Sequence, residues 1–309
     1  MRPHLNGIFP PIATPFDADG DLLLDGFREN LERWAKSRLS GFLVLGSNGE
    51  NAYLSDDEKL RLLREARPRI PQGKAMIVGA GKESTRLCIE FTRKAVDLGA
   101  DYALIDTPCY YKPRMNDDAL FAHFWSVADE SPIPILMYNV PQFTGVSVSA
   151  SLVEKLSSHE NIAGLKESSA NLALQAEIRR LTPDRFSLLV GSAPTLLASL
   201  IHGACGGIVA IAGVLPDQSV DLYEAFRAGN WDLATRLQKR LSPPAAAVTT
   251  QFGIPGLKAA MEFVGLTGGY PRLPLLPATP PQVAELREIF RSAGVGETAS
   301  KCGPMDAQK

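Results

Sequence analysis

Short apolar runs alternate with longer amphipathic segments along the first two-thirds of the chain. Eight of these runs are apolar or small at nearly every position, which is typical of strands that are buried on both faces of a parallel sheet. They begin at Gly7, Gly41, Ala75, Asp101, Ile133, Ile162, Phe186 and Gly206.

Stretches with helical spacing lie between the apolar runs. In residues 25–37, Phe27, Leu31 and Trp34 recur at the interval that places them on one helix face. The sequence Ser55-Asp56-Asp57-Glu58 matches a capping box, which predicts that a helix begins there. Further helices are predicted over residues 84–98, 117–130, 149–157, 172–181 and 193–202.

Eight strand-like runs that alternate with helices predict right-handed βαβ units, and their number and length fit a (β/α)8 TIM barrel. A doubly wound open sheet is the structural alternative, although no G-x-G-x-x-G motif follows the first run. After Ala212 only helical patterns follow, over residues 215–228, 231–241, 254–264 and 280–292. We therefore predict a catalytic barrel over 1–214, a helical C-terminal subdomain over 215–293 and a flexible tail over 294–309.

Composition and charge narrow the classes of function. The 309 residues are 45% hydrophobic and 21% charged, with a formal net charge of −2, which lacks the basic footprint of a nucleic-acid binder. The four cysteines form no CxxC pair and the four histidines lack metal-ligand spacing, so neither disulfides nor a metal site are expected. With no signal peptide and no apolar stretch long enough to span a bilayer, we expect a cytoplasmic protein without membrane contact.

Lys166 is the first candidate for chemistry, because the carboxyl end of each barrel strand faces the active mouth. It follows small and apolar residues in the run that begins at Ile162, so its stem should start inside the barrel. Burial disfavours the charged form of a lysine, and a neutral amine is what imine formation with a carbonyl requires. A lysine that only marks the end of a strand in water is the alternative.

Two neighbouring runs end in groups that could assist this lysine. Tyr138 ends the preceding run, so its hydroxyl should lie near the Lys166 amine and could relay protons, unless it is an ordinary core tyrosine. The segment Gly46-Ser47-Asn48-Gly49-Glu50 follows the second run. Its glycines allow a tight turn, and Ser47 and Asn48 offer donors that suit a carboxylate, although a plain turn would have the same sequence.

Other strand ends carry weaker candidates. Gly191 and Ser192 follow the seventh run, and Tyr110 and Tyr111 follow the fourth, where they could form a lid, a subunit contact or surface aromatics. Cys109 precedes the two tyrosines, and its role could be packing or that of a reactive thiol.

Taken in order, the segments GSNGE, TPCYY, YNVP, GLKESS and VGS resemble the dihydrodipicolinate synthase and N-acetylneuraminate lyase superfamily of pyruvate-dependent class I aldolases. The resemblance extends from about residue 7 to about residue 269. It implies a (β/α)8 barrel with a helical C-terminal extension, assembled as a homotetramer, a dimer of dimers.

The resemblance also implies a role for each matching residue. Lys166 matches the Schiff-base lysine and Tyr138 the tyrosine that handles the proton. Ser47 and Asn48 match the pair that binds the pyruvate carboxylate, with Ser47 also in the proton relay. The remaining matches are Tyr111, which would reach a neighbouring subunit's site, and the substrate-binding positions Ser168 and Gly191.

One position departs from the dihydrodipicolinate synthase pattern. Phe143 stands where that enzyme has an arginine for the second substrate's carboxylate, and an apolar ring cannot pair with a carboxylate. The sequence instead resembles 4-hydroxy-2-oxoglutarate aldolase in Ser47-Asn48, Cys109, the segment SPIPILMYNVP and the segment AAAVTTQFGIPGLK.

We therefore expect a carbon–carbon lyase that cleaves 4-hydroxy-2-oxoglutarate to pyruvate and glyoxylate. Lys166 would form the imine and Tyr138 would remove the proton of the 4-hydroxyl group, with no cofactor and no metal. The same chemistry on a 2-keto-3-deoxy sugar acid, or in dihydrodipicolinate synthesis, is the nearest alternative. A metal-dependent lyase and a non-catalytic pyruvate-binding protein are the others.

Overall fold

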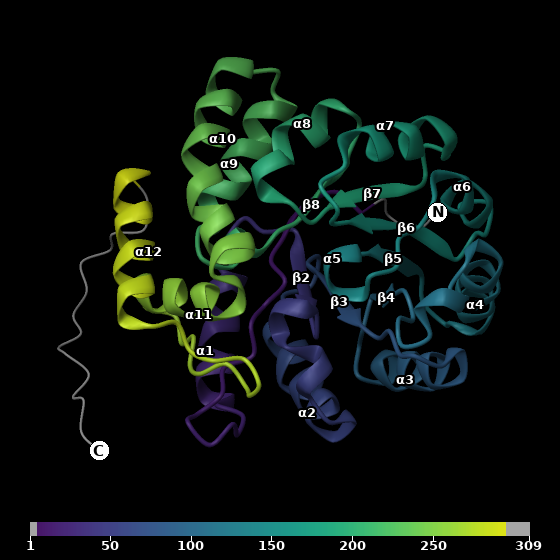
Figure 1. The fold of residues 1–309 in the computed structure, drawn as a ribbon, viewed down its shortest axis with the longest axis horizontal. Helices are drawn as coiled ribbons and strands as arrows, with labels where there is room; N and C mark the ends of the chain where they lie inside the picture. Colours follow the sequence, from purple (N-terminus) through teal and green to yellow (C-terminus); the bar gives the residue numbers. More distant parts are fainter. Residues whose placement is uncertain (1–4, 295–309) are drawn as a thin grey trace.

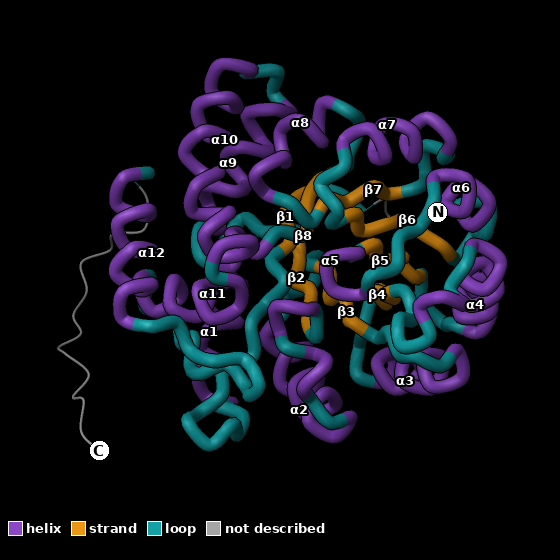
Figure 2. The backbone as a smooth tube through the Cα atoms, viewed as in Figure 1, coloured by secondary structure: helices purple, strands orange, loops and turns teal. Residues whose placement is uncertain are grey.

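Eight parallel strands lie at the centre of the molecule, with helices around them (Figures 1 and 2). The computed structural model describes residues 5–294. The order of the strands in the sheet is β1-β8-β7-β6-β5-β4-β3-β2, which confirms the predicted TIM barrel. The strands are β1 (Gly7–Phe9), β2 (Gly41–Val44), β3 (Ala75–Gly79), β4 (Tyr102–Asp106), β5 (Ile135–Asn139), β6 (Ile162–Glu167), β7 (Ser187–Val190) and β8 (Gly206–Ile208).

The barrel closes between β1 and β2. Regular pairing of β1 stops at Phe9 because Pro10 and Pro11 have no backbone N–H to donate. The proline segment still forms backbone hydrogen bonds with β2. The Leu43 N–H donates to the Pro10 carbonyl at 3.0 Å, and the Ile12 N–H donates to the Leu43 carbonyl at 3.0 Å. The short strand β1 and the proline segment after it therefore still complete the barrel.

A helix follows each strand and covers the outside of the barrel. The predicted capping box at Ser55 is present, and the predicted helices at residues 117–130, 172–181 and 280–292 have those bounds. The helices are α1 (Leu24–Ala35), α2 (Asp56–Ala66), α3 (Thr85–Asp97), α4 (Asp117–Glu130), α5 (Pro141–Thr144), α6 (Ala150–Leu156), α7 (Leu172–Leu181), α8 (Leu196–Ile201), α9 (Pro216–Arg227), α10 (Trp231–Ala246), α11 (Gly253–Phe263) and α12 (Pro280–Ser292).

Helix α10 runs further than the prediction, which ended it at Leu241. Pro243 and Pro244 lie inside it, and a π-helical turn over Ala247–Gln251 follows. Prolines normally stop a helix because they remove a donor and crowd the preceding turn. Here Pro244 is buried, and α10 packs against α9 and α12, so tertiary packing outweighs local propensity.

Two hydrophobic cores result from the strand geometry. Alternate side chains of each strand point into the barrel, where Phe9, Leu43, Leu104, Leu136 and Leu189 form one cluster. The other side chains point outward and pack with the apolar faces of the helices in a second, larger cluster. The middle of the barrel is thus filled with side chains, and the carboxyl ends of the strands are where an active site is expected in this fold.

The C-terminal helices gather at one side of the barrel (Figure 1). Helix α9 follows β8 and contacts β1, while α10 packs against α9 and α12. The division into a barrel over 1–214 and a helical subdomain over 215–293 stays a prediction. The predicted tail lies outside the described residues from 295 onward. Within residues 5–294, no helix is long and apolar enough to cross a membrane.

Replacing Gly164 by Ala should damage both folding and function. A Cβ at this position would lie 2.1 Å from the Ser187 carbonyl oxygen, so β6 and β7 could not keep their register, and Lys166 lies two residues further along. We expect a loss of more than about 2 kcal/mol in the free energy of unfolding, measured by urea denaturation.

Gly213→Ala is the matched control for this variant, because its added methyl group would meet atoms no closer than 3.9 Å. Equal stability of the Gly164→Ala and Gly213→Ala proteins would contradict the packing argument.

Candidate active site

Lys166 and Tyr138 lie side by side where β6 and β5 reach the mouth of the barrel. The parallel register pairs the two residues, and their side chains are 3% and 6% exposed. The Lys166 amine lies 4.1 Å from the centroid of the Tyr138 ring. The Lys166 amine and the Tyr138 phenol therefore lie next to each other as predicted, with the amine over the face of the ring at the bottom of the mouth.

Ser47 joins this pair from the loop after β2. Its hydroxyl lies 3.3 Å from the Tyr138 hydroxyl, and either group could donate. Ser47 opens a single 3-10 turn, Ser47–Gly49, which also places Asn48, and both residues are partly exposed. The Thr14 hydroxyl donates to the Gly49 carbonyl at 2.8 Å and holds the turn against the N-terminal segment. Two hydroxyls and an amine thus converge on one space.

Ser168 and Gly191 lie next to each other at the exits of β6 and β7. The Gly191 N–H donates to the Glu167 carbonyl at 2.7 Å, which extends the sheet by one more pair. A Cβ on Gly191 would lie 1.8 Å from the Ser168 Oγ, so only glycine leaves room for this serine. The structure therefore brings together the predicted pair on the rim beyond Lys166.

Glu167 supports this rim from behind and was not anticipated from the sequence. Its side chain is fully buried and accepts hydrogen bonds from Asn139 Nδ2 at 3.1 Å, Ser169 N at 2.7 Å and Gln175 Nε2 at 2.8 Å. These donors come from β5, from the loop after β6 and from α7, so one carboxylate ties three elements together. The signal in the sequence was its place directly after Lys166, since alternate strand residues face opposite sides.

Asp106 is a second residue of this layer that was not predicted, although it ends its own apolar run. It is paired with Tyr138 across β4 and β5, in the same row as Lys166. Gly81 leaves space for it, because a Cβ there would lie 1.7 Å from the carboxyl Oδ1. Burial raises the pKa of Asp106, with Glu83 adding to the rise, while the charges of Lys59 and Lys166 oppose it.

Tyr110 and Tyr111 do not enter this cluster. Tyr111 is 70% exposed, and its ring meets the Tyr110 ring edge-on at 5.0 Å between centroids. Glu83 fixes the chain before them by accepting from the backbone N–H groups of Cys109 at 2.9 Å and Tyr110 at 2.8 Å. Within one chain, the two tyrosines point to solvent beside the mouth.

Cys109 donates its thiol to Glu83 Oε1 at 3.2 Å. Burial and the hydrogen bond to the negatively charged Glu83 together raise the pKa of the Cys109 thiol to about 11. The reactive form of cysteine is the thiolate, so this thiol is inert at neutral pH.

Phe143 lies on α5, the short helix that follows β5, and is 65% exposed. Its neighbour Gln142 donates from Nε2 to the Ser168 carbonyl at 3.2 Å, so this helix borders the same mouth. The side of the mouth formed by α5 therefore presents an apolar ring.

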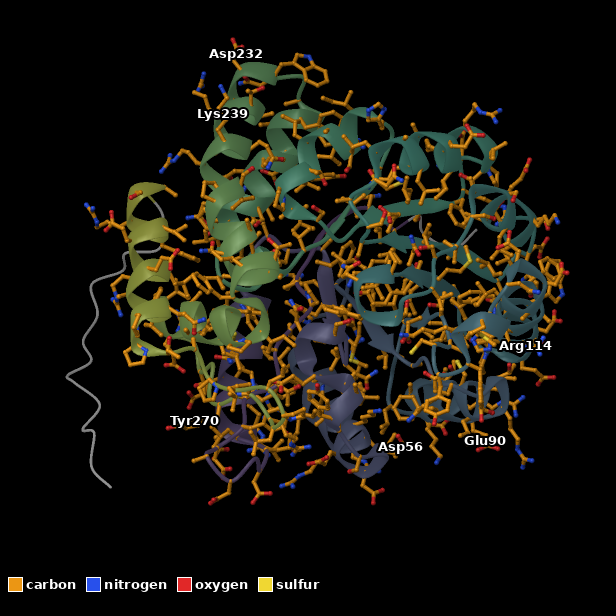
Figure 3. All side chains as sticks on the ribbon, viewed as in Figure 1. Asp56, Glu90, Arg114, Asp232, Lys239 and Tyr270 are labelled. Carbon is orange, nitrogen blue, oxygen red and sulfur yellow. The ribbon has the colours of Figure 1, made fainter. Side chains whose placement is uncertain are left out.

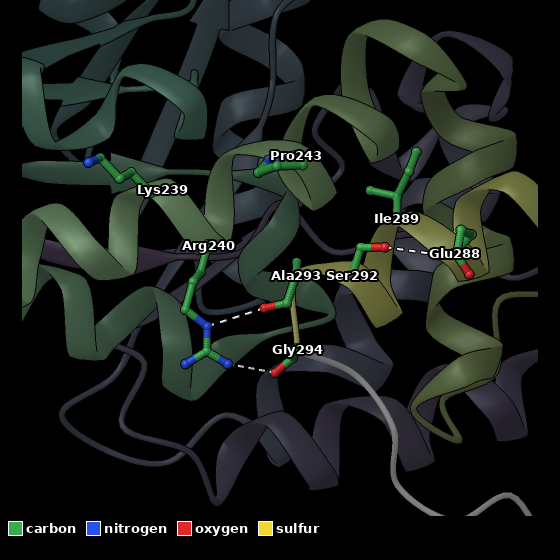
Figure 4. Close-up of a pocket in the computed structure, with 8 residues that line it drawn as sticks. All are labelled: Lys239, Arg240, Pro243, Glu288, Ile289, Ser292, Ala293 and Gly294. Atoms are coloured by element: carbon green, nitrogen blue, oxygen red, sulfur yellow. Dashed lines mark hydrogen bonds between the residues drawn. The ribbon is translucent and has the colours of Figure 1, made fainter.

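Two pockets lie away from the carboxyl ends of the strands. One of about 540 Å³ lies between α10 and α12, where the Arg240 guanidinium donates to the Gly294 carbonyl at 2.7 Å (Figure 4). Another of about 730 Å³ lies at the opposite end of the barrel, where Ala75 and Tyr102 begin β3 and β4. Neither is lined by Lys166, so the candidate site is placed by its chemistry and not by the size of a cavity. Among residues 5–294, no cluster of His, Cys, Asp and Glu could hold a metal ion.

Comparison with known proteins gives the family. The model of the dihydrodipicolinate synthetase family matches residues 4–293. The chain belongs to this family. It is 38% identical to the 4-hydroxy-tetrahydrodipicolinate synthase of Methanothrix thermoacetophila, over 92% of this chain and 95% of the relative. It is 34% identical to the synthase of that name from an Exiguobacterium species, over 91% and 95%.

The same family appears among solved structures. Dihydrodipicolinate synthase from Cyanidioschyzon merolae, solved with lysine bound, has a TM-score of 0.90 and 30% identity, covering 95% of this chain and all of that one. The synthase DapA-2 from Bacillus anthracis has a TM-score of 0.89 and 28% identity, covering 93% and 98%. The chain is an enzyme of the carbon–carbon lyase class, in a family that uses pyruvate.

These relatives overturn the expected reaction. The prediction of a 4-hydroxy-2-oxoglutarate aldolase, with glyoxylate as its second product, is wrong, because relatives at 33–38% identity are named 4-hydroxy-tetrahydrodipicolinate synthase. The prediction relied on Phe143, on Ser47-Asn48 and Cys109, and on the segments SPIPILMYNVP and AAAVTTQFGIPGLK. Similarity along more than nine-tenths of the chain outweighs them.

The pKa of Cys109 gives a prediction for this site. Alkylation by iodoacetamide should be slow at pH 7.5 and rise about tenfold per pH unit toward pH 11, because only the thiolate reacts. Peptide mapping by mass spectrometry measures Cys109 separately from the other cysteines. Glu83→Gln should speed the reaction at pH 9, since that variant lacks the charge that disfavours the thiolate, and a rate that levels off near pH 8 in the original protein would refute the assignment.

Proposed function

We propose that this chain is a pyruvate-condensing synthase in which Lys166 forms an imine with pyruvate and the resulting enamine attacks an aldehyde, as in 4-hydroxy-tetrahydrodipicolinate synthesis. The observation that carries the proposal is the row of groups at the mouth: the Lys166 amine over Tyr138, whose hydroxyl is within reach of Ser47. The names of the relatives support the direction of the reaction.

The chemistry then follows from this arrangement. The Lys166 amine adds to C2 of pyruvate and water leaves, which gives a protonated imine that withdraws electrons from C3. Loss of a C3 proton gives the enamine, with Tyr138 and Ser47 as the groups that carry protons to and from the site. C3 attacks the aldehyde carbon of aspartate semialdehyde, and its oxygen takes a proton. The substrate's own amino group then replaces the lysine at C2, closing the ring and freeing Lys166.

Binding of pyruvate is assigned to the rim. Ser47 and Asn48 supply donors for the pyruvate carboxylate, and Ser168 and Gly191 line the opposite side of the mouth. The exposed Tyr111 fits a contact with a second copy of the chain, so the proposal includes a homotetramer built from dimers, in which Tyr111 completes the proton relay of a neighbouring site. The location in the cytoplasm stays a prediction.

Trapping with borohydride tests the imine. Incubation with pyruvate and sodium borohydride should add the mass of one reduced pyruvate at Lys166, since reduction turns the imine into a stable secondary amine. Lys166→Ala should show no adduct and lose at least about 10³-fold in turnover, measured by mass spectrometry and by a coupled assay of pyruvate consumption. Borohydride without pyruvate is the control, and an adduct on another lysine would sink the assignment.

Lys112 is the cation that we assign to the carboxylate of the second substrate, because Phe143 cannot pair with it. The Lys112 side chain lies against Gly145, the residue that ends α5: a Cβ on that glycine would lie 3.1 Å from Nζ. A lysine here is on the same side of the mouth as Phe143 and would pair with the carboxylate of the aldehyde substrate.

Lys112→Ala should raise the KM for aspartate semialdehyde about tenfold, which corresponds to about 1.4 kcal/mol, and leave the KM for pyruvate unchanged. Arg114→Ala is the matched control from the same turn, labelled in Figure 3, and should change neither value. An equal effect of both variants would point to a general field of positive charge. Rapid use of uncharged hydroxyaldehydes, with no reaction of aspartate semialdehyde, would reject the synthase and keep the imine.

A further inference from the structure

Glu50 ends the loop that carries Ser47 and Asn48, and its carboxylate is buried against Lys258. The distance between Glu50 Oε1 and Lys258 Nζ is 2.5 Å, and the side chains are 0% and 1% exposed. Charges taken out of water are costly unless they are paired, and removing one partner leaves the other uncompensated. The two residues therefore determine each other's position.

The hydrogen bonds of this pair join it to the C-terminal part of the chain, and the Phe16 ring covers the lysine. Lys258 lies on α11, and its amine donates to the Tyr270 carbonyl at 2.6 Å while lying 4.6 Å from the centroid of the Phe16 ring. Glu50 Oε2 accepts from the Arg272 N–H at 2.8 Å. Tyr270 is on the loop that follows α11 (Figure 3). Helix α11 and this loop thus hold the barrel loop from outside the mouth.

The backbone conformation of Glu50 requires stabilising contacts of this kind. Its φ of 56° lies in the left-handed region, which residues with a side chain adopt seldom and at a cost. The Glu50 N–H donates to the Ser47 carbonyl at 3.0 Å, so this strained residue closes the turn that contains both Ser47 and Asn48. A change at Glu50 is therefore transmitted directly to these two residues.

Arg272 fixes the next part of the same segment. Its guanidinium donates to Glu58 Oε1 at 2.6 Å and to the Tyr53 carbonyl at 2.8 Å. Arg272 thus binds the segment from Glu50 to Glu58 at three residues, namely Glu50, Tyr53 and Glu58. Ion pairs and hydrogen bonds require particular atoms to meet, so these contacts select one conformation of the loop. Apolar packing alone would not do so.

We propose that Glu50 and Lys258 are positioning residues: their buried ion pair sets the pyruvate-binding turn Ser47–Gly49 from the C-terminal helices without touching the substrate. The inference rests on the proposed function, because it assumes that this turn binds the carboxylate of pyruvate. It assigns to α11 a part in the affinity for pyruvate.

Three variants test the pair: Lys258→Met, Glu50→Gln and the double variant that carries both. Each single variant should raise the KM for pyruvate at least tenfold, because the turn that would bind its carboxylate moves. The value of kcat should fall by a smaller factor, because Ser47 shifts while Lys166 and Tyr138 stay in place. Arg28→Met is the matched control, since it removes an ion pair with Glu65 between α1 and α2, away from the turn, and should leave both constants unchanged.

The double variant separates positioning from stability. It leaves no unpaired buried charge, so its melting temperature should return toward that of the original protein, while its KM for pyruvate stays high. A KM that returns together with the melting temperature would show that the pair is merely structural and would overturn the proposal. If Lys258→Met fails to fold, Glu50→Gln carries the same test, because it keeps the volume and an acceptor for Arg272.

Hydrogen exchange of residues 46–54 gives a readout that does not depend on catalysis. Exchange there should rise at least tenfold in Glu50→Gln and stay unchanged in Arg28→Met. Unchanged exchange in Glu50→Gln would refute the positioning role even in an active enzyme. Absence of borohydride trapping in the original protein would instead reject the proposed function, and the exchange result would still decide whether the pair holds the turn.

Discussion

The parallel register between β5 and β6 is the constraint on which the site depends. It places Tyr138 beside Lys166, and the register with β4 adds Asp106 to the same row. Side chains alternate between the two faces of a strand, so a slip of β6 by one residue against β5 would turn Lys166 to the outside of the barrel, away from Tyr138. The backbone register therefore determines which side chains meet at the mouth of the barrel.

Charged groups behind the rim keep that row in place. Glu167 binds donors from three elements, and Glu50 binds Lys258 and the backbone of Arg272. Both carboxylates immediately follow a segment with a proposed role in the site, and both are fully buried. Because a buried charge tolerates few arrangements of its partners, such groups are suited to holding loops that would otherwise sample many conformations.

The sequence was informative where the signal is local. Eight apolar runs predicted the strands, and the rule of strand ends selected Lys166, Tyr138, Ser47 and Gly191 as candidate residues, which the structure places at the mouth of the barrel. The pair of Glu50 and Lys258 could not be found in this way, because no periodicity links residues that are so distant along the chain. Helix α10 also exceeded its prediction, since burial of Pro244 outweighs the usual effect of proline.

The choice of reaction failed for a different reason. Phe143 and Cys109 indicated another branch of the superfamily. A single side chain at the rim can differ, however, while the rest of the barrel stays similar in sequence to the synthases. In the proposed function, Lys112 beside Gly145 would supply the cation from a neighbouring loop that the YNVP motif does not include. Position in space, which the sequence motif does not give, decides which charge a substrate meets.

The closure of the barrel has a consequence for how the chain folds. Strand β1 is made first, yet it pairs with β8 through residues such as Gly7 and Gly206, and the Gly7 N–H donates to the Cys205 carbonyl at 3.1 Å. During synthesis on the ribosome, some two hundred further residues have to be added before β8 can pair with β1 and cover its second edge. Contacts so distant in sequence are slow to form. The proline segment after β1 offers few free donors during that wait, which limits the pairing of this edge with other chains.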